Sequence, residues 1–173
     1  MKKTIILLLL LMAAPLWAES RSLNLGLSYN YLLEQPFAET GQHAPGFAFS
    51  YNFIVKENFH LGISTALRRF GGQNRLWQLG YGLLLKHYLW YSAEHSWHPY
   101  LSYGLLLSVS SQRNASGTGT AHDTRLTAGL DFELFSQLWF FEASYNFSRL
   151  RFFDTDSINL DYFEAMLGLQ FRW

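Results

Sequence analysis

Apolar and small or polar side chains alternate one by one through most of this chain. The final eight residues, 166–173, show the pattern clearly: leucine and aromatic side chains occupy every second position, and the chain ends on Trp173. Successive side chains of an extended strand point to opposite faces, so the alternation predicts strands with one apolar face. The other face of each strand carries mainly glycine, serine, asparagine and a few charged residues.

The alternation divides into eight segments. They are residues 23–31, 47–53, 59–68, 77–86, 101–109, 126–134, 139–147 and 162–173. Most are close to the roughly 9–11 residues that a tilted strand needs to cross a membrane, and their number is even. Lipid offers no water to unpaired backbone groups, so the last strand must pair with the first. The sequence therefore predicts an all-β fold, an eight-stranded antiparallel up-and-down transmembrane β-barrel.

The connections between these segments also alternate in length. Those after the second, fourth and sixth segments are mostly short, whereas 33–45, 112–123 and 151–159 are longer and polar. Short turns at one end and long loops at the other are typical of membrane barrels. We expect both termini at the end with short turns, and outer contacts through residues 34–44 and 112–123.

The first 18 residues form a separate segment. A basic start, Met1–Thr4, precedes an uninterrupted apolar run, Ile5–Met12, and residues 13–18 then form a candidate processing site that ends at Ala18. This order is typical of a secretory signal peptide, and the apolar run is shorter than the roughly 20 residues of a spanning helix. We predict a cleaved signal peptide at 1–18 and a single barrel domain at 19–173.

Composition narrows the possible functions. Aromatic residues make up 18% of the chain and charged residues 15%, below the roughly 25% charge usual in soluble domains. The absence of cysteine excludes disulfides, thiolate metal sites and lipid attachment through cysteine. Without the leader the formal net charge is −2, which provides no reason to bind nucleic acid. No metal-ligand cluster or phosphate-binding glycine motif is present, and we expect no cofactor.

The glycine-rich face distinguishes a membrane barrel from a soluble one. Glycine weakens a strand on a water-exposed surface, but small residues fit where eight strands close around a narrow lumen. A soluble lipocalin-type carrier is the remaining alternative. It is less favoured because the early Gly-x-Trp motif of lipocalins is missing, since no tryptophan occurs between Trp17 and Trp77.

The same face carries most of the ionisable residues of the predicted strands. Charges in a narrow lumen must pair to offset their desolvation, so we predict an interior ion-pair network. Its members are Lys86, Arg172, Asp131, Glu133 and Glu142 towards the terminal end of the barrel, with Arg68 and Glu164 nearer the other end. The simpler interpretation is structural ion pairing, and the sharper one is a conductance gate.

In these features the chain resembles the small outer-membrane proteins of the OmpA transmembrane-domain and OmpX type. Gly168, Phe171 and Trp173 match the C-terminal assembly signal of such barrels, although Met166 stands where a polar residue is usual. The resemblance implies a monomer in the bacterial outer membrane with periplasmic termini. It also implies contact with membrane lipid and lipopolysaccharide, and with periplasmic chaperones and the β-barrel assembly machinery during biogenesis.

Some barrels of this size are enzymes acting on lipid A, such as the deacylase PagL and the palmitoyltransferase PagP. The deacylase requires a histidine and a serine two residues apart on a lipid-facing strand, and no His-x-Ser occurs on any predicted strand. His122 and Asp123 fall in a predicted loop, with Ser110 and Ser111 nearby in sequence. We expect a non-enzymatic protein and retain lipid A modification as the alternative.

Overall fold

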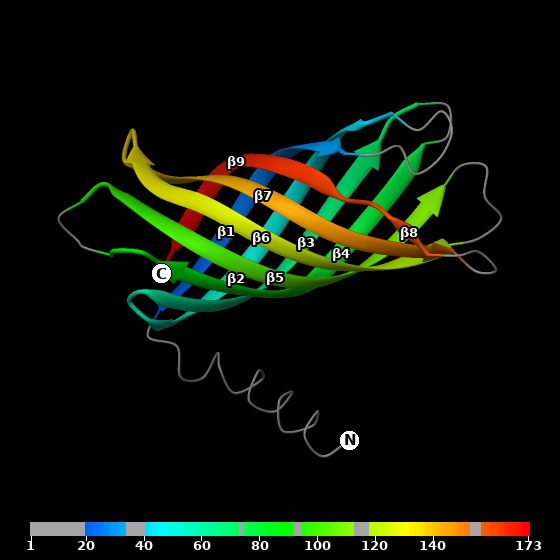
Figure 1. The fold of residues 1–173 in the computed structure, drawn as a ribbon. Helices are drawn as coiled ribbons and strands as arrows, with labels where there is room; N and C mark the ends of the chain where they lie inside the picture. The colour runs from blue at the N-terminus through cyan, green and yellow to red at the C-terminus, as the bar shows by residue number, and fades with distance from the viewer. Residues whose placement is uncertain (1–19, 34–40, 73–74, 92–94, 113–117, 153–156) are drawn as a thin grey trace, which may run out of the picture.

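A computed structural model describes residues 20–33, 41–72, 75–91, 95–112, 118–152 and 157–173 (Figure 1). The signal peptide predicted at 1–18 lies outside these residues. The strands are β1 (Ser20–Leu32), β2 (His43–Lys56), β3 (Phe59–Phe70), β4 (Leu76–Tyr88), β5 (Trp97–Gln112), β6 (Thr118–Leu134), β7 (Gln137–Phe152), β8 (Ile158–Asn159) and β9 (Tyr162–Arg172). Within the described ranges, no helix is long and apolar enough to cross a membrane.

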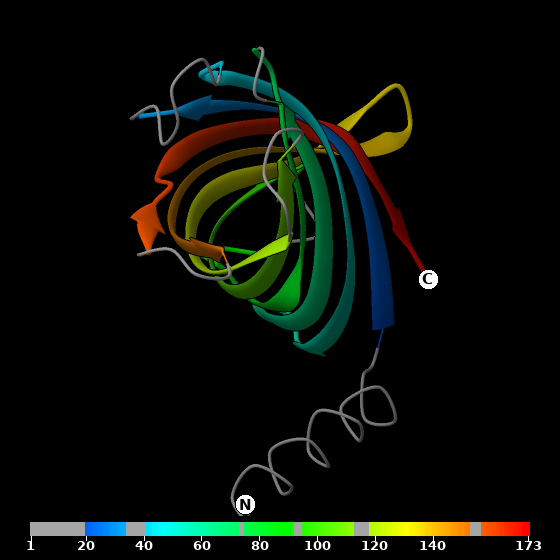
Figure 2. The same ribbon diagram turned by 90° about the vertical axis from the view of Figure 1, so that its right-hand side faces the viewer.

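Eight of the strands described above close into an antiparallel barrel (Figures 1 and 2). Each strand from β1 to β7 pairs with the next, and β9 pairs with both β7 and β1. The backbone of Trp173 exchanges hydrogen bonds of 2.9 and 3.1 Å with Arg21, so pairing continues to the end of the chain. The predicted eight-stranded up-and-down barrel is therefore confirmed. The two-residue strand β8 is an addition that pairs only with β7.

Close approach of β1 and β9 depends on glycine. Gly26 lies opposite Gly168 across this pair of strands. A Cβ at Gly168 would lie 2.1 Å from the carbonyl oxygen of Leu25 and 2.6 Å from Phe140, which is too close for any side chain. The lumen-facing glycines thus leave room for neighbouring backbone and large inward side chains, as the strand pattern predicts.

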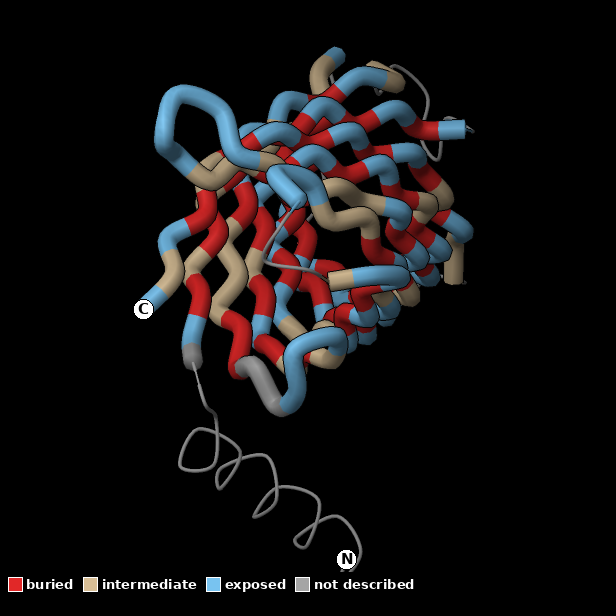
Figure 3. Tube along the Cα trace, turned by 90° about the vertical axis from the view of Figure 1, so that its left-hand side faces the viewer, coloured by how far each residue is buried: buried red, intermediate tan, exposed pale blue. Residues whose placement is uncertain are grey.

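Burial alternates along the strands as the sequence pattern predicts (Figure 3). The outward face exposes leucine and aromatic side chains; Leu27 is 72% exposed and Phe163 51%. The inward face buries serine, asparagine, arginine and carboxylate side chains. A soluble barrel would show the reverse, with apolar residues inside. The apolar face therefore lies on the outside.

The two ends of the barrel differ. We call the end that carries the β2–β3, β4–β5 and β6–β7 connections the turn end, and the opposite end the loop end (Figure 1). Described residues at both ends of the chain, Ser20 in β1 and Trp173 after β9, lie at the turn end. At the tip of β6–β7, Phe135 and Ser136 both have positive φ, of 54° and 58°, which matches the tight hairpin turns of twisted strands.

Several strands extend further towards the loop end than predicted. β6 begins at Thr118, so residues 118–123 are strand, and the loop predicted at 112–123 was wrong there. Beyond Phe147, β7 continues to Phe152 with Arg149 exposed on its outward face. Backbone pairing continues here, but the outward side chains become polar, so the alternation that marks a strand disappears. Of the predicted contact segments, residues 34–40 and 113–117 lie outside the described residues.

Strand β5 also begins earlier than predicted, at Trp97, and includes Pro99. The preceding connection remains paired, since Leu89 donates its backbone N–H to the Pro99 carbonyl at 2.9 Å. The rings of Trp90 and Trp97 meet edge to face at 5.2 Å. The β4–β5 hairpin therefore continues past the ends predicted for both strands.

Candidate functional site

A buried cluster around Asp131 fills the lumen near the turn end. Lys86 Nζ lies 3.0 Å from both carboxylate oxygens of Asp131 and 3.5 Å from the ring centroid of Tyr100. Gln170 donates a hydrogen bond of 3.1 Å to Asp131 Oδ2, and the Tyr88 hydroxyl donates to the same oxygen. The carboxylate is thus satisfied by three side chains from β4 and β9. We call Lys86, Tyr88, Tyr100, Asp131 and Gln170 the turn-end cluster.

Arg172 contacts this cluster from the side of the turn end. Its Nη2 lies 3.8 Å from Asp131 Oδ2, and its Nη1 donates a 2.5 Å hydrogen bond to the hydroxyl of Tyr91. Tyr91 follows β4 and stacks on His98 with ring centroids 4.8 Å apart. The β4–β5 connection therefore places an aromatic ring beneath the lumen, where it contacts a residue of the last strand.

Four charged side chains span the lumen further towards the loop end. We call Arg68, Arg125, Glu142 and Glu164 the central cluster. Arg125 Nη2 lies 2.8 Å from Glu142 and 3.3 Å from Glu164, while Arg68 Nη2 lies 3.3 Å from Glu164. Tyr100 donates a 2.7 Å hydrogen bond to Glu142 and so joins the two clusters. Two guanidinium groups alternate with two carboxylates, which offsets the cost of burying each charge.

Most of the residues predicted for an interior network lie in these clusters, but two of them do not pair as predicted. Lys86 and Arg172 contact Asp131, and Arg68 contacts Glu164. Glu142 instead pairs with Arg125, which was not predicted from the sequence because the sixth predicted segment begins at Leu126. Continuing the alternation one step towards the loop end would have placed Arg125 inside.

Glu133 is the exception among the predicted residues. Its side chain is exposed near the β6–β7 turn, outside both clusters. The β6–β7 hairpin extends past its neighbouring strands there. A side chain on the inward face of β6 at this position therefore no longer points into the closed lumen. Its inclusion in the network was wrong.

A ring of apolar side chains closes the lumen at the loop end. All of its members are at most 1% exposed; they come from seven strands and from Leu160, which follows β8. We call this ring the apolar collar; it consists of Leu32, Ala44, Phe70, Leu76, Ala121, Leu150, Leu160 and Tyr162. Phe70 and Tyr162 meet edge to face at 6.0 Å. The collar was not predicted from the sequence, because its inward apolar residues depart from the polar pattern of the lumen face elsewhere.

A second, smaller apolar patch explains Met166. Its side chain is buried with Phe140, Ala48 and Ala66 on the lumen wall. A Cβ at Gly26 would lie 2.7 Å from Met166 Sδ, so this glycine makes room for it. The position where a polar residue is usual in related signals is therefore occupied by a packed apolar side chain.

The other C-terminal signal residues take the predicted faces. Phe171 is 43% and Trp173 59% exposed on the outward side, and Gly168 faces inward against β1. Tyr51 lies beside Trp173 with ring centroids 6.1 Å apart. The two aromatics are thus accessible at the turn end.

One small cavity lies beside the central cluster. A cavity of about 10 Å³ lies among Asn24, Ser64, Arg125, Glu142 and neighbouring residues. That volume is about enough for one water molecule. In the part of the chain that the structure describes, the two clusters and the collar occupy successive levels of the lumen.

The histidine and acid considered for catalysis point to opposite sides of the barrel wall. His122 is exposed on the outward face of β6, whereas Asp123 is 2% exposed and accepts hydrogen bonds from Ser108 and Ser148. Ser110 faces inward as well. A strand separates the imidazole from the carboxylate, so these residues do not form a Ser-His-Asp arrangement. The prediction that His122 and Asp123 lie in a loop was wrong.

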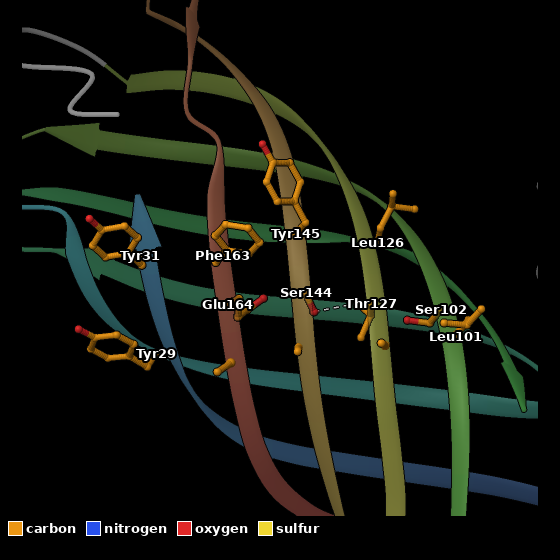
Figure 4. Close-up of a pocket in the computed structure, with 13 residues that line it drawn as sticks. Tyr29, Tyr31, Leu101, Ser102, Leu126, Thr127, Ser144, Tyr145, Phe163 and Glu164 are labelled. Atoms are coloured by element: carbon orange, nitrogen blue, oxygen red, sulfur yellow. Dashed lines mark hydrogen bonds between the residues drawn. The ribbon is translucent and has the colours of Figure 1, made fainter. Parts of the chain in front are cut away.

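The outward face has a groove of about 660 Å³ that is centred on β6, β7 and β9 and bordered by residues of β5 and β1 (Figure 4). Ala128, Ala143 and Ala165 form one continuous register row at its floor. Tyr145 and Phe163 pair in the next outward row towards the loop end and form its rim. The polar side chains beneath the floor face the lumen; there Thr127 and Ser144 share a 2.8 Å hydrogen bond.

The described residues contain no group of three or more histidine, aspartate or glutamate side chains that could hold a metal ion. The buried carboxylates are instead engaged by arginine, lysine, tyrosine and serine. The chemistry of the lumen is therefore that of paired charges and hydrogen bonds.

The sequence matches no protein-family model and no curated protein. The structure is similar to the outer membrane protein OprG from Pseudomonas aeruginosa, with a TM-score of 0.66, 11% identity and coverage of 90% of this chain and 96% of OprG. It is also similar to Neisserial surface protein A, with a TM-score of 0.63, 11% identity and coverage of 87% and 95%. For the outer membrane enzyme PagL the TM-score is 0.51, with 12% identity and coverage of 85% and 97%. At these identities the likeness concerns the fold, which is that of small eight-stranded outer-membrane barrels.

Proposed function

We propose that this protein is an integral outer-membrane barrel with a filled interior, and that it acts in the envelope as a structural and surface-contact protein through its loop end. The observation that carries this proposal is the lumen. The turn-end cluster, the central cluster and the apolar collar occupy successive levels of it. Such a barrel suits a rigid anchor better than a wide pore, which eight strands do not provide.

The same fold supports a proposed orientation in the membrane. The turn end, with both described ends of the chain, faces the periplasm, and the loop end faces outwards, as in barrels with short periplasmic turns. Phe171 and Trp173, exposed at the turn end, are accessible to the assembly machinery. The protein is a monomer that contacts membrane lipid and lipopolysaccharide.

Membrane fractionation with heat-modifiable gel migration tests the assignment. The expected result is recovery in the outer-membrane fraction and a shift in apparent size on boiling, because a closed barrel resists detergent until heated. A C-terminal epitope tag, cleaved by protease only after the outer membrane is permeabilised, tests the orientation. Recovery in the soluble periplasm, or migration unchanged by boiling, contradicts the proposal.

Modification of lipid A is the second candidate, because the fold is also that of PagL. Against it, His122 and Asp123 occupy opposite faces of β6. Mass spectrometry of lipid A from cells with and without the protein distinguishes the two. Unchanged acyl chains support the non-enzymatic role, and a lost or added acyl chain supports the enzyme.

A further inference from the structure

Two of the strands that carry the outward groove, β6 and β7, also carry exposed cationic side chains towards the loop end. We call Arg149, Arg151 and His122 the cationic rim. Along β7 the outward side chains run from Ala143 through Tyr145 and Phe147 to Arg149 and Arg151. The groove therefore continues towards the loop end along an aromatic track that terminates in two exposed guanidinium groups.

The neighbouring strand β6 strengthens this cationic rim. His122 lies opposite Arg149 in the register, and Thr120 lies opposite Arg151. All four side chains are exposed. Arg149 Nε donates a 2.9 Å hydrogen bond to Ser157, which orients its side chain. The nearby carboxylate of Asp161 accepts a hydrogen bond of 3.2 Å from the Ser148 backbone.

The spacing between groove and rim matches one leaflet of a membrane. Ala143 and Arg149 are six residues apart, which is about 20 Å along a strand. With the usual tilt of 35–45° this becomes about 15 Å of depth, or half of a hydrocarbon core of about 30 Å. The alanine floor thus lies near the midplane when the arginines lie at the headgroup level.

We propose that this face binds one phosphorylated glycolipid of the outer leaflet, of the lipid A type. Its phosphate group contacts Arg149, Arg151 and His122, and one acyl chain follows Phe147 into the groove above Ala143. Arginine forms charge-assisted, bidentate hydrogen bonds with phosphate, and the groove volume is within the usual range for ligand sites. The proposal rests on the proposed outer-membrane orientation and adds to it a specific lipid and its binding site.

The groove is tested with Ala143→Phe, which places a ring over the floor without changing charge. The matched control is Thr65→Phe, which fills a different outward groove, of about 420 Å³, on β3 and β4. Native mass spectrometry of the full barrel in detergent, titrated with purified lipid A, measures the bound fraction. We expect Ala143→Phe to weaken binding about five- to tenfold and Thr65→Phe to leave it unchanged.

The rim is tested with Arg149→Gln combined with Arg151→Gln, using lipid A with and without its phosphates. We expect the native protein to prefer the phosphorylated form about tenfold, and the double variant to lose this preference. The matched control, Arg69→Gln combined with Arg75→Gln, removes two arginines from the other side of the loop end and should keep the preference.

Equal binding of the two lipid A forms by the native protein overturns the proposal, as does equal loss of binding with Thr65→Phe and Ala143→Phe. Phosphatidylglycerol competing as well as lipid A also contradicts it, because that lipid supplies phosphate without the glycolipid. Heat-modifiable migration of each variant is measured in parallel. If the barrel is intact and binding is absent, the lipid site fails; if the native chain forms no heat-modifiable barrel, the outer-membrane function itself fails.

Discussion

The apolar collar and the central cluster face the same lumen and are both buried, yet their chemistry is opposite. Leu76 and Phe70 of the collar stand two positions from Gln78 and Arg68 on the same inward faces. The collar is stabilised by close packing, whereas the cluster depends on every charge having a partner. Burial in this lumen therefore does not dictate polarity. What it requires is that each level be filled and, where polar, paired.

The two levels also fail differently when altered. Removing an atom from the collar leaves a void whose lining loses dispersion contacts. Removing one charge from the central cluster leaves another charge buried and uncompensated. The central cluster should consequently be the more sensitive of the two to a single change.

Glu164→Gln should have the largest effect. The carboxylate contacts both Arg68 and Arg125 at 3.3 Å, so its neutralisation leaves two buried guanidinium groups with one cluster carboxylate, Glu142, which pairs with Arg125. We expect a loss of about 3–5 kcal/mol in the free energy of unfolding. Urea-induced unfolding in lipid vesicles, followed by tryptophan fluorescence, measures it. Glu133→Gln, which neutralises an exposed carboxylate, is the control and should change stability by less than about 0.5 kcal/mol. Equal effects of the two variants would remove the distinction between cluster and surface.

Leu150→Ala should have a smaller but clear effect on the collar. The side chain is fully buried, and its truncation costs about 2–4 kcal/mol through lost burial and the cavity left behind. The outward Leu107→Ala, at a position 45% exposed, is the matched control. Lipid fills the space there, so we expect a much smaller loss in the same unfolding assay. If Leu150→Ala and Leu107→Ala lower the free energy of unfolding equally, the collar is not a packed layer.

Gln78 lies on β4 between the apolar collar and the central cluster. Of the three changes, Gln78→Met should have the smallest effect on stability. Both polar atoms of the Gln78 side chain are buried without a hydrogen-bond partner among the described residues. Methionine has a similar volume and removes the unsatisfied amide, so we expect the barrel to gain up to about 1 kcal/mol. Asn30→Leu is the comparison, because the Asn30 side chain donates to Ala44 and accepts from Arg68. Loss of these hydrogen bonds in Asn30→Leu should destabilise the barrel. A higher free energy of unfolding in both variants would argue against a polar level next to the collar.

The strands themselves were predictable from the sequence because alternation is a local property. Each outward leucine or aromatic has a small or polar neighbour, and this determines the face without reference to other strands. The prediction failed where that local contrast was lost. Thr118 to Asp123 and Arg149 to Phe152 continue their strands beyond the apolar band, so their outward side chains are polar or charged.

The partners inside the lumen were less predictable. Lys86 and Asp131 were both expected inside, but their contact depends on β4 and β6 facing each other across the lumen, separated by β5. The pairing of Glu142 with Arg125 required the register of β6 against β7, which places Arg125 opposite Asn146 and Gly129 opposite Glu142. Neither relation is visible in the spacing of residues along the chain.

By itself the sequence determined that this chain forms eight alternating strands, which face of each strand is apolar, and that the last strand pairs with the first, because parity and backbone pairing are local or topological constraints. Only the tertiary structure decided how the interior is layered. Barrel closure and strand register bring leucines from separate strands into the apolar collar, join Arg68 to Glu164 across the lumen, and align three alanines into one outward groove. These contacts link residues far apart in sequence, and their geometry exists only once the barrel is closed.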